Sequence, residues 1–333
     1  MGNDLNKMIS VCIPVYNGAL TIEETIASIL AQTVKDFECV VVDNASSDTT
    51  PQVVKAIPDT RIRFFRNDKN LGCGGNLNEC FNRVRGDVLF FMAADDIASP
   101  NALEKVMDAF AMDEKIGIVT RPYYWFQTDV RWPVRATRQF KERQVVSIGD
   151  DFDKVSSVLA LSDQISGMAF RKKYMKATFG RDYFVEMSTQ VAAMLKECRA
   201  VILKENIVAV RIADNGAMKP YVYEKSPMMC WYDMVTKTYE GDGFKPLKDH
   251  LIRNFIANNF IGFVQIKNFS GYRALFREIG LLIKLNWLNI FKPAFWFFSL
   301  GTIIVPRALL WKMVVFYKNK INSAFLRNIK LGE

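Results

Sequence analysis

The sequence predicts an α/β protein in which a mostly parallel sheet is flanked by helices and followed by a helical C-terminal region. Two observations favour this fold class. Short apolar segments alternate with helical segments between residues 8 and 120, a pattern typical of parallel sheets. Polar residues follow several of the apolar segments at the point where each ends. In such sheets a ligand lies at the carboxyl ends of the strands, so we expect the site there.

The first strand and helix have clear local patterns. Residues 8–15 alternate apolar and polar side chains, which predicts a strand. Thr21 and Glu24 have the spacing of a capping box, and apolar residues then recur at helical spacing to Leu30. Residues 37–42 form a second apolar segment, which predicts a buried strand.

Further strands are predicted at 61–65, 87–92 and 116–120. A glycine-rich loop at 70–78 leads into a helix, and Ser99 followed by Pro100 predicts the N-cap and first residue of another. We expect residues 200–212 to form a hairpin or two edge strands.

The regular spacing of apolar residues weakens from residue 121, and from residue 224 onward the pattern is mainly that of helices. These changes predict two regions, a sheet domain over residues 1–215 and a helical region over residues 216–333.

Composition and charge limit the classes of function. The formal net charge of +9 and the pI of about 9.2 favour an anionic partner. The six cysteines form no C-x-x-C pair, which indicates core thiols in a reducing compartment rather than a zinc site. With His250 as the single histidine, acid–base chemistry is expected to fall to carboxylates. The first residues lack the apolar segment of a signal peptide, which predicts a cytoplasmic protein.

Five segments together resemble a known family: IPVYN (13–17), SILAQT (28–33), VVVDNASSD (40–48), NLGCGGNLN (70–78) and AADD (93–96). Their order and spacing are similar to those of inverting family-2 glycosyltransferases with the Rossmann-like GT-A fold. The resemblance implies transfer of a sugar from a nucleotide-diphosphate donor to a hydroxyl acceptor, with inversion. It also implies a role in cell-surface polysaccharide or lipid-linked glycan assembly.

The expected donor-binding residues follow the first two strands: Pro14, Tyr16, Asp43 and Asn44. The first two are expected to pack against the base or ribose. The resemblance gives the base contact to Asn44, where the family usually has an acidic residue; an Asx turn is the alternative for this side chain. The diphosphate contact is expected from Asn76 or from backbone N–H groups, because Leu77 stands where an arginine is common.

Asp95 and Asp96 match the family's metal-binding motif. The resemblance implies that Asp95 faces the ribose and that Asp96 binds Mg²⁺ or Mn²⁺, which accept carboxylate and phosphate oxygens. Ala93 stands where a third aspartate is frequent, a departure that leaves fewer acidic groups. The alternative is that the pair supplies negative charge to the N-terminus of the following helix.

The catalytic base has two candidates. By the resemblance, Glu186 occupies the first position of an acidic pair at the start of a helix, and Met187 occupies the second. Asp182 lies four residues before Glu186 and is the competing candidate. A helix-start acid stabilised by the helix dipole is the structural alternative for Glu186.

The C-terminal region combines aromatic and basic residues. Residues 293–306 are almost wholly apolar but shorter than the roughly 20 residues that span a bilayer. From residue 281 onward eight residues are basic and only Glu333 is acidic: Lys284, Lys292, Arg307, Lys312, Lys318, Lys320, Arg327 and Lys330. This pattern predicts peripheral contact with an anionic membrane, at the inner face of the cell membrane. A packed helical cap, an oligomer contact and a re-entrant hairpin remain alternatives.

Three other functions compete with the transferase. A nucleic-acid binder would explain the net charge, but the basic residues are dispersed and no RNA-binding octapeptide is present. A catalytically inactive, membrane-associated nucleotide-sugar-binding or scaffold protein would explain the departures at Ala93, Leu77 and Met187. A nucleotidyltransferase would need a glycine-rich loop after the first strand, which the sequence lacks.

Overall fold

The computed structural model describes residues 8–175, 179, 185–212, 225–316 and 326–333. The chain divides into two compact units, Met1–Ala213 together with Phe325–Glu333, and Asp214–Ala324. Each unit has its own helices or sheets, so the units are described separately.

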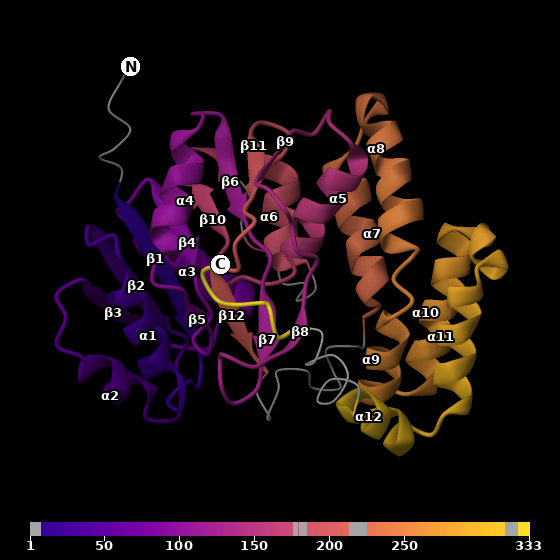
Figure 1. Ribbon diagram of the computed structural model, residues 1–333, viewed down its shortest axis with the longest axis horizontal. Helices are drawn as coiled ribbons and strands as arrows, with labels where there is room; N and C mark the ends of the chain where they lie inside the picture. The colour runs from indigo at the N-terminus through magenta and orange to yellow at the C-terminus, as the bar shows by residue number, and fades with distance from the viewer. Residues whose placement is uncertain (1–7, 176–178, 180–184, 213–224, 317–325) are drawn as a thin grey trace. The chain divides into compact units, whose positions relative to one another are not determined.

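The first unit is built on an eight-stranded sheet with the order β3-β2-β1-β4-β10-β6-β11-β9 among the described residues (Figure 1). Its strands β1, β2, β3 and β4 run parallel, and β10 and β9 are the antiparallel members. The predicted mostly parallel sheet flanked by helices is therefore confirmed. The strands are β1 (Ile9–Val15), β2 (Phe37–Asp43), β3 (Ile62–Arg66), β4 (Val88–Phe91), β6 (Ile116–Thr120), β9 (Gln144–Val146), β10 (Ala169–Arg171) and β11 (Arg199–Ile202).

The interior of this sheet explains the continuous apolar segments in the sequence. Every residue of β2 and β4 is buried, because neighbouring strands cover both edges and helices cover the faces. The helix α3 contacts β1 and β2, while α4 and α6 contact β6. The helices of the first unit are α1 (Ile22–Leu30), α2 (Thr50–Lys55), α3 (Gly72–Arg83), α4 (Ala102–Ala111), α5 (Phe152–Leu161) and α6 (Glu186–Met194).

A second, four-stranded sheet has the order β5-β12-β7-β8, and β12 ends beside the carboxyl end of β4. The C-terminal segment, yellow in Figure 1, returns to this sheet, where the N–H of Gly332 donates to the carbonyl oxygen of Asn206 at 2.8 Å. Ile329 and Leu331 pack against an apolar cluster that includes Tyr124. The strands are β5 (Ile97–Ala98), β7 (Tyr124–Phe126), β8 (Pro133–Ala136) and β12 (Val208–Arg211).

Three local predictions are wrong. Residues 200–212 contain two strands, but these form neither a hairpin nor sheet edges, because β11 lies between β6 and β9 in the large sheet and β12 lies between β5 and β7 in the small one. Helix α4 begins at Ala102 and not at Pro100, since the hydroxyl of Ser99 donates to the side chain of Asn101 and does not cap the helix. The Thr21 hydroxyl likewise donates to the carbonyl of Ala94, so the expected capping box does not form.

The second unit is helical, as the sequence predicts for this stretch. Helix α9 contacts α10, α11 and α12, and the rings of Phe260 and Phe295 pack edge to face at 5.5 Å. Among the described residues, none of the helices combines the length and apolar character needed to cross a bilayer. The helices are α7 (Pro227–Thr238), α8 (Lys245–His250), α9 (Gly262–Phe269), α10 (Tyr272–Leu285), α11 (Pro293–Ile304) and α12 (Arg307–Phe316).

Candidate functional site

The carboxyl ends of β1, β2 and β4 bring three polar segments to one edge of the large sheet. Strand β1 lies between the other two and is parallel to both. The N–H of Asn17, after β1, donates to the hydroxyl of Ser46, after β2, at 2.8 Å. The hydroxyl of Thr21 donates to the carbonyl oxygen of Ala94, after β4, at 2.9 Å. Segments that are far apart in the sequence therefore form one site.

Pro14 and Tyr16 lie at the end of β1. Pro14 is partly buried within the strand, whereas the side chain of Tyr16 is 52% exposed immediately after it. Asn17 then has a positive φ of 53°, which turns the chain away from the strand direction. The Tyr16 ring is thus open to a flat ligand at this edge.

Asp43, the last residue of β2, is fully buried. One carboxylate oxygen accepts a hydrogen bond from the N–H of Ser46 at 3.2 Å and lies 3.3 Å from Nε of Arg66. Arg66 also donates to the carbonyl oxygen of Ser46 at 2.9 Å. Asp43 therefore anchors the turn after β2 and orients Arg66, a cation that the sequence analysis missed.

The side chain of Asn44 is buried and uses its full hydrogen-bonding capacity within the protein. Its amide NH₂ donates to Oδ1 of Asn70 at 3.0 Å and to the carbonyl of Gly72 at 3.1 Å. Its Oδ1 accepts from Nδ2 of Asn67 at 3.0 Å and from the N–H of Leu71 at 2.9 Å. An asparagine amide has two donors and one acceptor oxygen with two lone pairs. Asn44 thus holds the loop after β3 in place.

Asn67 connects this network to helix α3, because its NH₂ also donates to Oδ1 of Asn76 at 3.0 Å. The amide of Asn76 in turn donates to the carbonyl of Val42 at 3.0 Å. Both residues are buried. The oxygen and the nitrogen of the Asn76 amide therefore each have a partner within the protein. Asn67 follows β3 directly, as Asn44 follows β2, and this shared position in the sequence is a signal that could have identified it.

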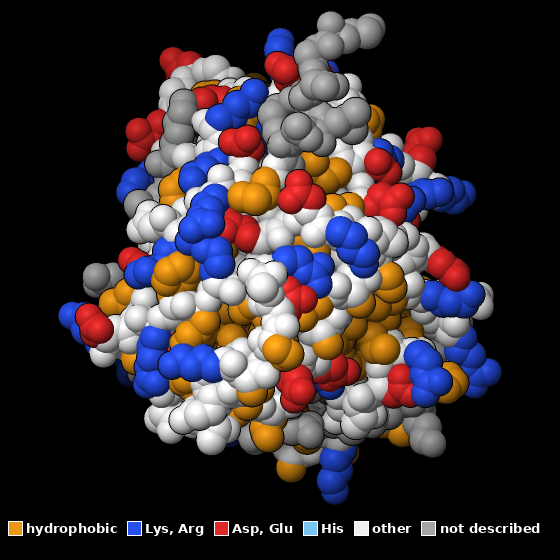
Figure 2. All heavy atoms as spheres, turned by 90° about the vertical axis from the view of Figure 1, so that its left-hand side faces the viewer, with side chains coloured by type: hydrophobic (Ala, Val, Ile, Leu, Met, Phe, Trp, Pro, Cys, Tyr) orange, Lys and Arg blue, Asp and Glu red, His pale blue; other side chains and the backbone are white. Residues whose placement is uncertain are grey.

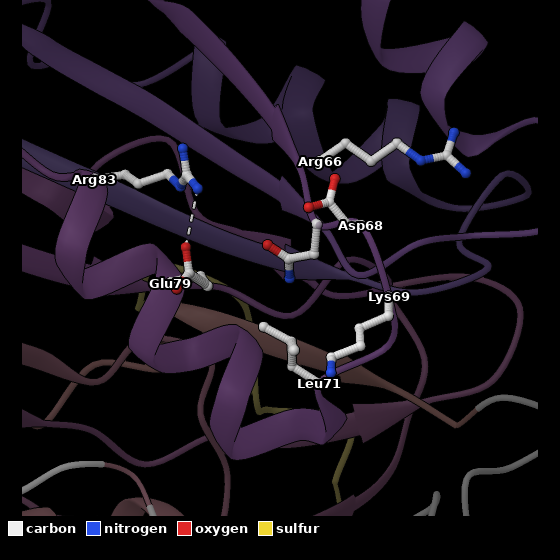
Figure 3. Close-up of a pocket in the computed structure, with 7 residues that line it drawn as sticks. Arg66, Asp68, Lys69, Leu71, Glu79 and Arg83 are labelled. Atoms are coloured by element: carbon white, nitrogen blue, oxygen red, sulfur yellow. Dashed lines mark hydrogen bonds and ion pairs between the residues drawn. The ribbon is translucent and has the colours of Figure 1, made fainter.

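A hollow of about 470 Å³ lies beside this network, between the loop after β3 and one side of α3 (Figure 3). Three cations line it: Arg66 from the end of β3, Lys69 from the loop and Arg83 from α3. Arg83 forms an ion pair with Glu79 one turn earlier on the same helix, at 3.0 Å. The full lining comprises Arg66, Asn67, Asp68, Lys69, Leu71, Glu79 and Arg83.

Asp96 is almost completely buried, with 1% of its surface exposed. Its Oδ2 accepts a hydrogen bond from the hydroxyl of Ser166 at 2.5 Å, and its Oδ1 accepts from the backbone N–H of Arg211 at 2.8 Å. The Arg211 side chain donates to the carbonyl oxygen of Asp95 at 2.9 Å and pairs with Glu24. The two aspartates are therefore held from the β10 side and from the end of β12, by residues that the sequence analysis missed.

Both aspartates lie in surroundings that disfavour the negatively charged form of a carboxyl group. Burial raises the pKa of Asp96 well above its usual range, and the adjacent Asp95 raises it further. Burial also raises the pKa of Asp95, although the charge of Arg211 lowers it. Within the described parts of the chain, neither carboxylate forms an ion pair and no three potential ligands cluster around a metal position. Two uncompensated carboxylates suit a divalent cation that takes its other ligands from phosphate and water.

Of the two candidate bases, only Glu186 lies within the described residues; Asp182 lies outside them. Glu186 is the first residue of α6 and is 8% exposed. Its Oε1 accepts a hydrogen bond from the N–H of Gly74 at 3.1 Å, in the first turn of α3. Gly72, two residues earlier, accepts from Asn44. The structure therefore brings Glu186 to the glycine-rich loop, where it also satisfies an N–H group that the helix leaves unpaired.

The profile of the family described as glycosyl transferase family 2 matches residues 10–175. An uncharacterized protein of Mycobacterium tuberculosis is 36% identical over 136 residues, which cover 41% of this chain and 42% of the relative. The succinoglycan biosynthesis protein ExoO of Rhizobium meliloti is 38% identical over 100 residues, or 30% of this chain and 29% of that protein. The chain thus matches less than half the length of each of these curated relatives.

Two solved structures share the fold over most of their length. Residues 1–349 of S. aureus TarS, in complex with UDP-GlcNAc, align with a TM-score of 0.64 at 17% identity, covering 93% of this chain and 91% of that one. The mannosyltransferase PcManGT from Pyrobaculum calidifontis, in complex with GDP-Man and Mn²⁺, aligns with a TM-score of 0.54 at 17% identity, covering 96% and 86%. The family match shows that residues 10–175 of this chain belong to glycosyl transferase family 2, and the two alignments, together with the mostly parallel sheet, show that the chain has the GT-A fold.

Proposed function

We propose that this protein transfers a sugar from a nucleoside-diphosphate donor to a hydroxyl acceptor, with inversion at the anomeric carbon. The observation that carries the proposal is the meeting of Tyr16, the turn after Asp43, and Asp95–Asp96 at the carboxyl ends of three adjacent parallel strands. An aromatic ring, a turn that is bonded to the cation Arg66, and a carboxylate pair suit a base, a diphosphate and the metal ion that the diphosphate would bind.

On the donor side, Pro14 and Tyr16 form the wall for the base or ribose. Asn44 and Asn76 act mainly by holding the loop after β3, since both amides are already bonded within the protein. Arg66, kept in place by Asp43, supplies positive charge beside this wall. The donor of TarS contains UDP and that of PcManGT contains GDP, so relatives of this fold accept different bases.

Asp96, with Asp95 beside it, would hold Mg²⁺ or Mn²⁺. When bound, such an ion neutralises the charge that develops on the leaving diphosphate. Asp95 is the more exposed of the two residues, and its proposed role is to face the ribose. The hydrogen bonds from Ser166 and Arg211 leave further lone pairs on the Asp96 oxygens for a cation.

Glu186 is our candidate for the base that removes the proton from the acceptor hydroxyl, and Asp182 remains the alternative. Glu186 lies at the loop where Asn44 and Gly72 meet, and its Oε1 accepts a hydrogen bond from the N–H of Gly74. A carboxylate in that place can accept a proton as the acceptor oxygen attacks the sugar.

The acceptor is proposed to be a growing cell-surface polysaccharide or a lipid-linked glycan. The similarity to ExoO, named for succinoglycan biosynthesis, supports a polysaccharide. The second unit supports a membrane-proximal acceptor, because most of the exposed large hydrophobic residues in the described chain lie between Tyr272 and Phe316. Over the same stretch Glu278 is the only acidic residue, and it is buried.

This surface fits the inner face of an anionic cell membrane. Three of the exposed apolar side chains on α11, Phe297, Leu300 and Ile304, share one face of the helix, and the 3-10 helix Trp287–Phe291 adds two aromatic rings. Exposed basic residues, among them Lys284, Arg307 and Lys312, provide the complementary charge. We therefore propose peripheral attachment through this unit.

The substitution Asp96→Ala tests the proposed activity. It should abolish both transfer and donor hydrolysis, measured by release of the nucleoside diphosphate, while circular dichroism shows a folded protein. The matched control is Asp129→Ala, which removes a carboxylate paired with Arg131 on an exposed loop and should leave turnover unchanged. Full activity in Asp96→Ala would count decisively against the proposal.

A further inference from the structure

Ser166 is the one side chain of the described structure that donates a hydrogen bond to the Asp96 carboxylate. It lies in the segment between α5 and β10, seventy residues from Asp96 in the sequence. The other donor to Asp96 is a backbone N–H, from Arg211, which no substitution at that position removes except proline. The orientation of the carboxylate therefore depends on one exchangeable group.

The direction of the Ser166 hydroxyl is fixed by a second contact. Its oxygen accepts a hydrogen bond from the N–H of Ala93 at 2.8 Å, three residues before Asp96. A hydroxyl has a single proton to donate, and here that proton goes to Oδ2 of Asp96. Ser166 thereby ties the start and the end of the loop AADD to each other.

The backbone around Ser166 is joined to β4, the strand that leads into the aspartate pair. The N–H of Gly167 donates to the carbonyl of Phe91 at 2.8 Å, and the N–H of Phe91 donates to the carbonyl of Met168 at 2.9 Å. The hydroxyl and the carboxylate are therefore attached to the same rigid strand, so their relative positions are set by the fold.

A buried arginine supports this segment from behind. The guanidinium of Arg121 donates to the carbonyl oxygens of Leu161 and Gln164 at 2.9 and 3.0 Å. Gly167 has a φ of 82°, and a Cβ there would lie 2.7 Å from Nε of Arg121. Only glycine lets the segment pass this close to the arginine. This close approach helps to hold Ser166 within hydrogen-bonding distance of Asp96.

We propose that Ser166 is the positioning residue of the metal site, which holds the Asp96 carboxylate in the orientation that a divalent cation requires. This rests on the proposed function, because it assigns Ser166 a role only toward the metal that Asp96 would bind. Outer-shell hydrogen bonds to metal-binding carboxylates commonly change metal affinity by about 10- to 100-fold.

The test measures Mn²⁺ binding by calorimetry in the presence of saturating UDP, and in parallel GDP, for the full chain and three variants. Ser166→Ala should weaken Mn²⁺ binding by about tenfold or more. Ser166→Cys, which retains a weak donor, should fall between Ser166→Ala and the unaltered protein. Nucleotide binding in the presence of a chelator should stay within about twofold, because the base and ribose contacts are untouched.

The matched control is Ser162→Ala. Ser162 is buried in the same connection, and its hydroxyl contacts Leu159 and Ser188 instead of the aspartates. Loss of the Ser162 hydroxyl should lower the melting temperature by about as much as loss of the Ser166 hydroxyl. The Mn²⁺ affinity of Ser162→Ala should stay within about twofold of that of the unaltered protein.

Two results would overturn the assignment. Equal Mn²⁺ affinity in folded Ser166→Ala and the unaltered protein would show that the carboxylate needs no positioning. Equal weakening in Ser162→Ala would show that general loosening of the segment is responsible. If the unaltered protein binds neither nucleotide with Mn²⁺, the proposed function fails together with the assignment, whereas the two results above leave that function standing.

Discussion

At the residue scale, the chemistry of the site depends on how far each polar side chain is already engaged in the fold. Asp43, Asn44 and Asn76 all have protein partners and shape the edge of the sheet. Tyr16 is exposed, and the Asp95–Asp96 pair has no ion pair among the described residues. This lack of a positive partner is one reason why we propose that a cation binds there.

One substitution separates the structural contact of Glu186 from its proposed role as the catalytic base. In Glu186→Gln the amide oxygen can still accept the hydrogen bond from Gly74, so the start of α3 keeps its partner. The amide cannot take up a proton, so kcat should fall by about 10²- to 10⁴-fold while the melting temperature changes little. Glu197→Gln, an exposed residue just after the same helix, serves as the control. A normal kcat in Glu186→Gln would transfer the role of base to Asp182.

At the element scale, the loop between β3 and α3 is organised by asparagines and not by apolar packing. Asn44 reaches this loop from β2 and contacts Asn67, Asn70, Leu71 and Gly72 through its two amide atoms. The loop also carries Lys69, one of the three cations that line the hollow in Figure 3, and it lies between the other two, Arg66 at the end of β3 and Arg83 in α3.

Asn44→Ala should therefore destabilise the protein and loosen the loop. The change leaves several buried or partly buried groups without partners, and we expect a loss of about 2–4 kcal/mol in the free energy of unfolding. Asn70→Ala removes a contact of the same network at an exposed residue and should cost about 1 kcal/mol or less. Urea denaturation measures both. A loss in Asn44→Ala no larger than in Asn70→Ala would mean that the network does not organise the loop.

At the scale of the whole molecule, the basic charge is unevenly distributed. The face of the molecule in Figure 2 mixes Lys and Arg side chains with Asp and Glu side chains, unlike the one-sided patch typical of nucleic-acid-binding surfaces. Between Tyr272 and Phe316 the exposed side chains are basic or apolar. This contrast supports a lipid partner for the second unit.

Binding to lipid vesicles tests that partner. The protein should sediment with vesicles of phosphatidylcholine and phosphatidylglycerol, but only weakly with phosphatidylcholine alone, and added salt should reduce binding. The double change Phe297→Ser and Ile304→Ser should weaken binding about tenfold, since both side chains are more than 70% exposed on α11. Trp132→Ser, an exposed aromatic of the first unit, should have no effect. Concentration-dependent self-association without vesicle binding would favour the oligomer contact instead.

Much of the fold could be predicted from sequence because the strands of the parallel sheet are buried on both faces. Continuous apolar segments such as residues 87–92 leave little ambiguity, and the observed β4 spans Val88–Phe91. The partners of the site residues were not predictable in the same way. Ser166 and Arg211 lie 70 and 115 residues from Asp96, and only the folded sheet brings them to it. The two predicted helix caps do not form, because the hydroxyl groups have other partners. Thr21 donates to the carbonyl oxygen of Ala94, and Ser99 donates to the side chain of Asn101.

We propose that the carboxyl ends of β1, β2 and β4 bind a nucleotide-sugar through a metal held by Asp96. A thermal-shift screen of nucleotide-sugars, with Mn²⁺ or with a chelator, is the decisive measurement. At least one donor should raise the melting temperature by about 3–8 °C with Mn²⁺ and by much less with the chelator. Asp96→Asn should lose the metal-dependent part. A shift of the same size without metal, or no shift with any donor, would contradict the claim.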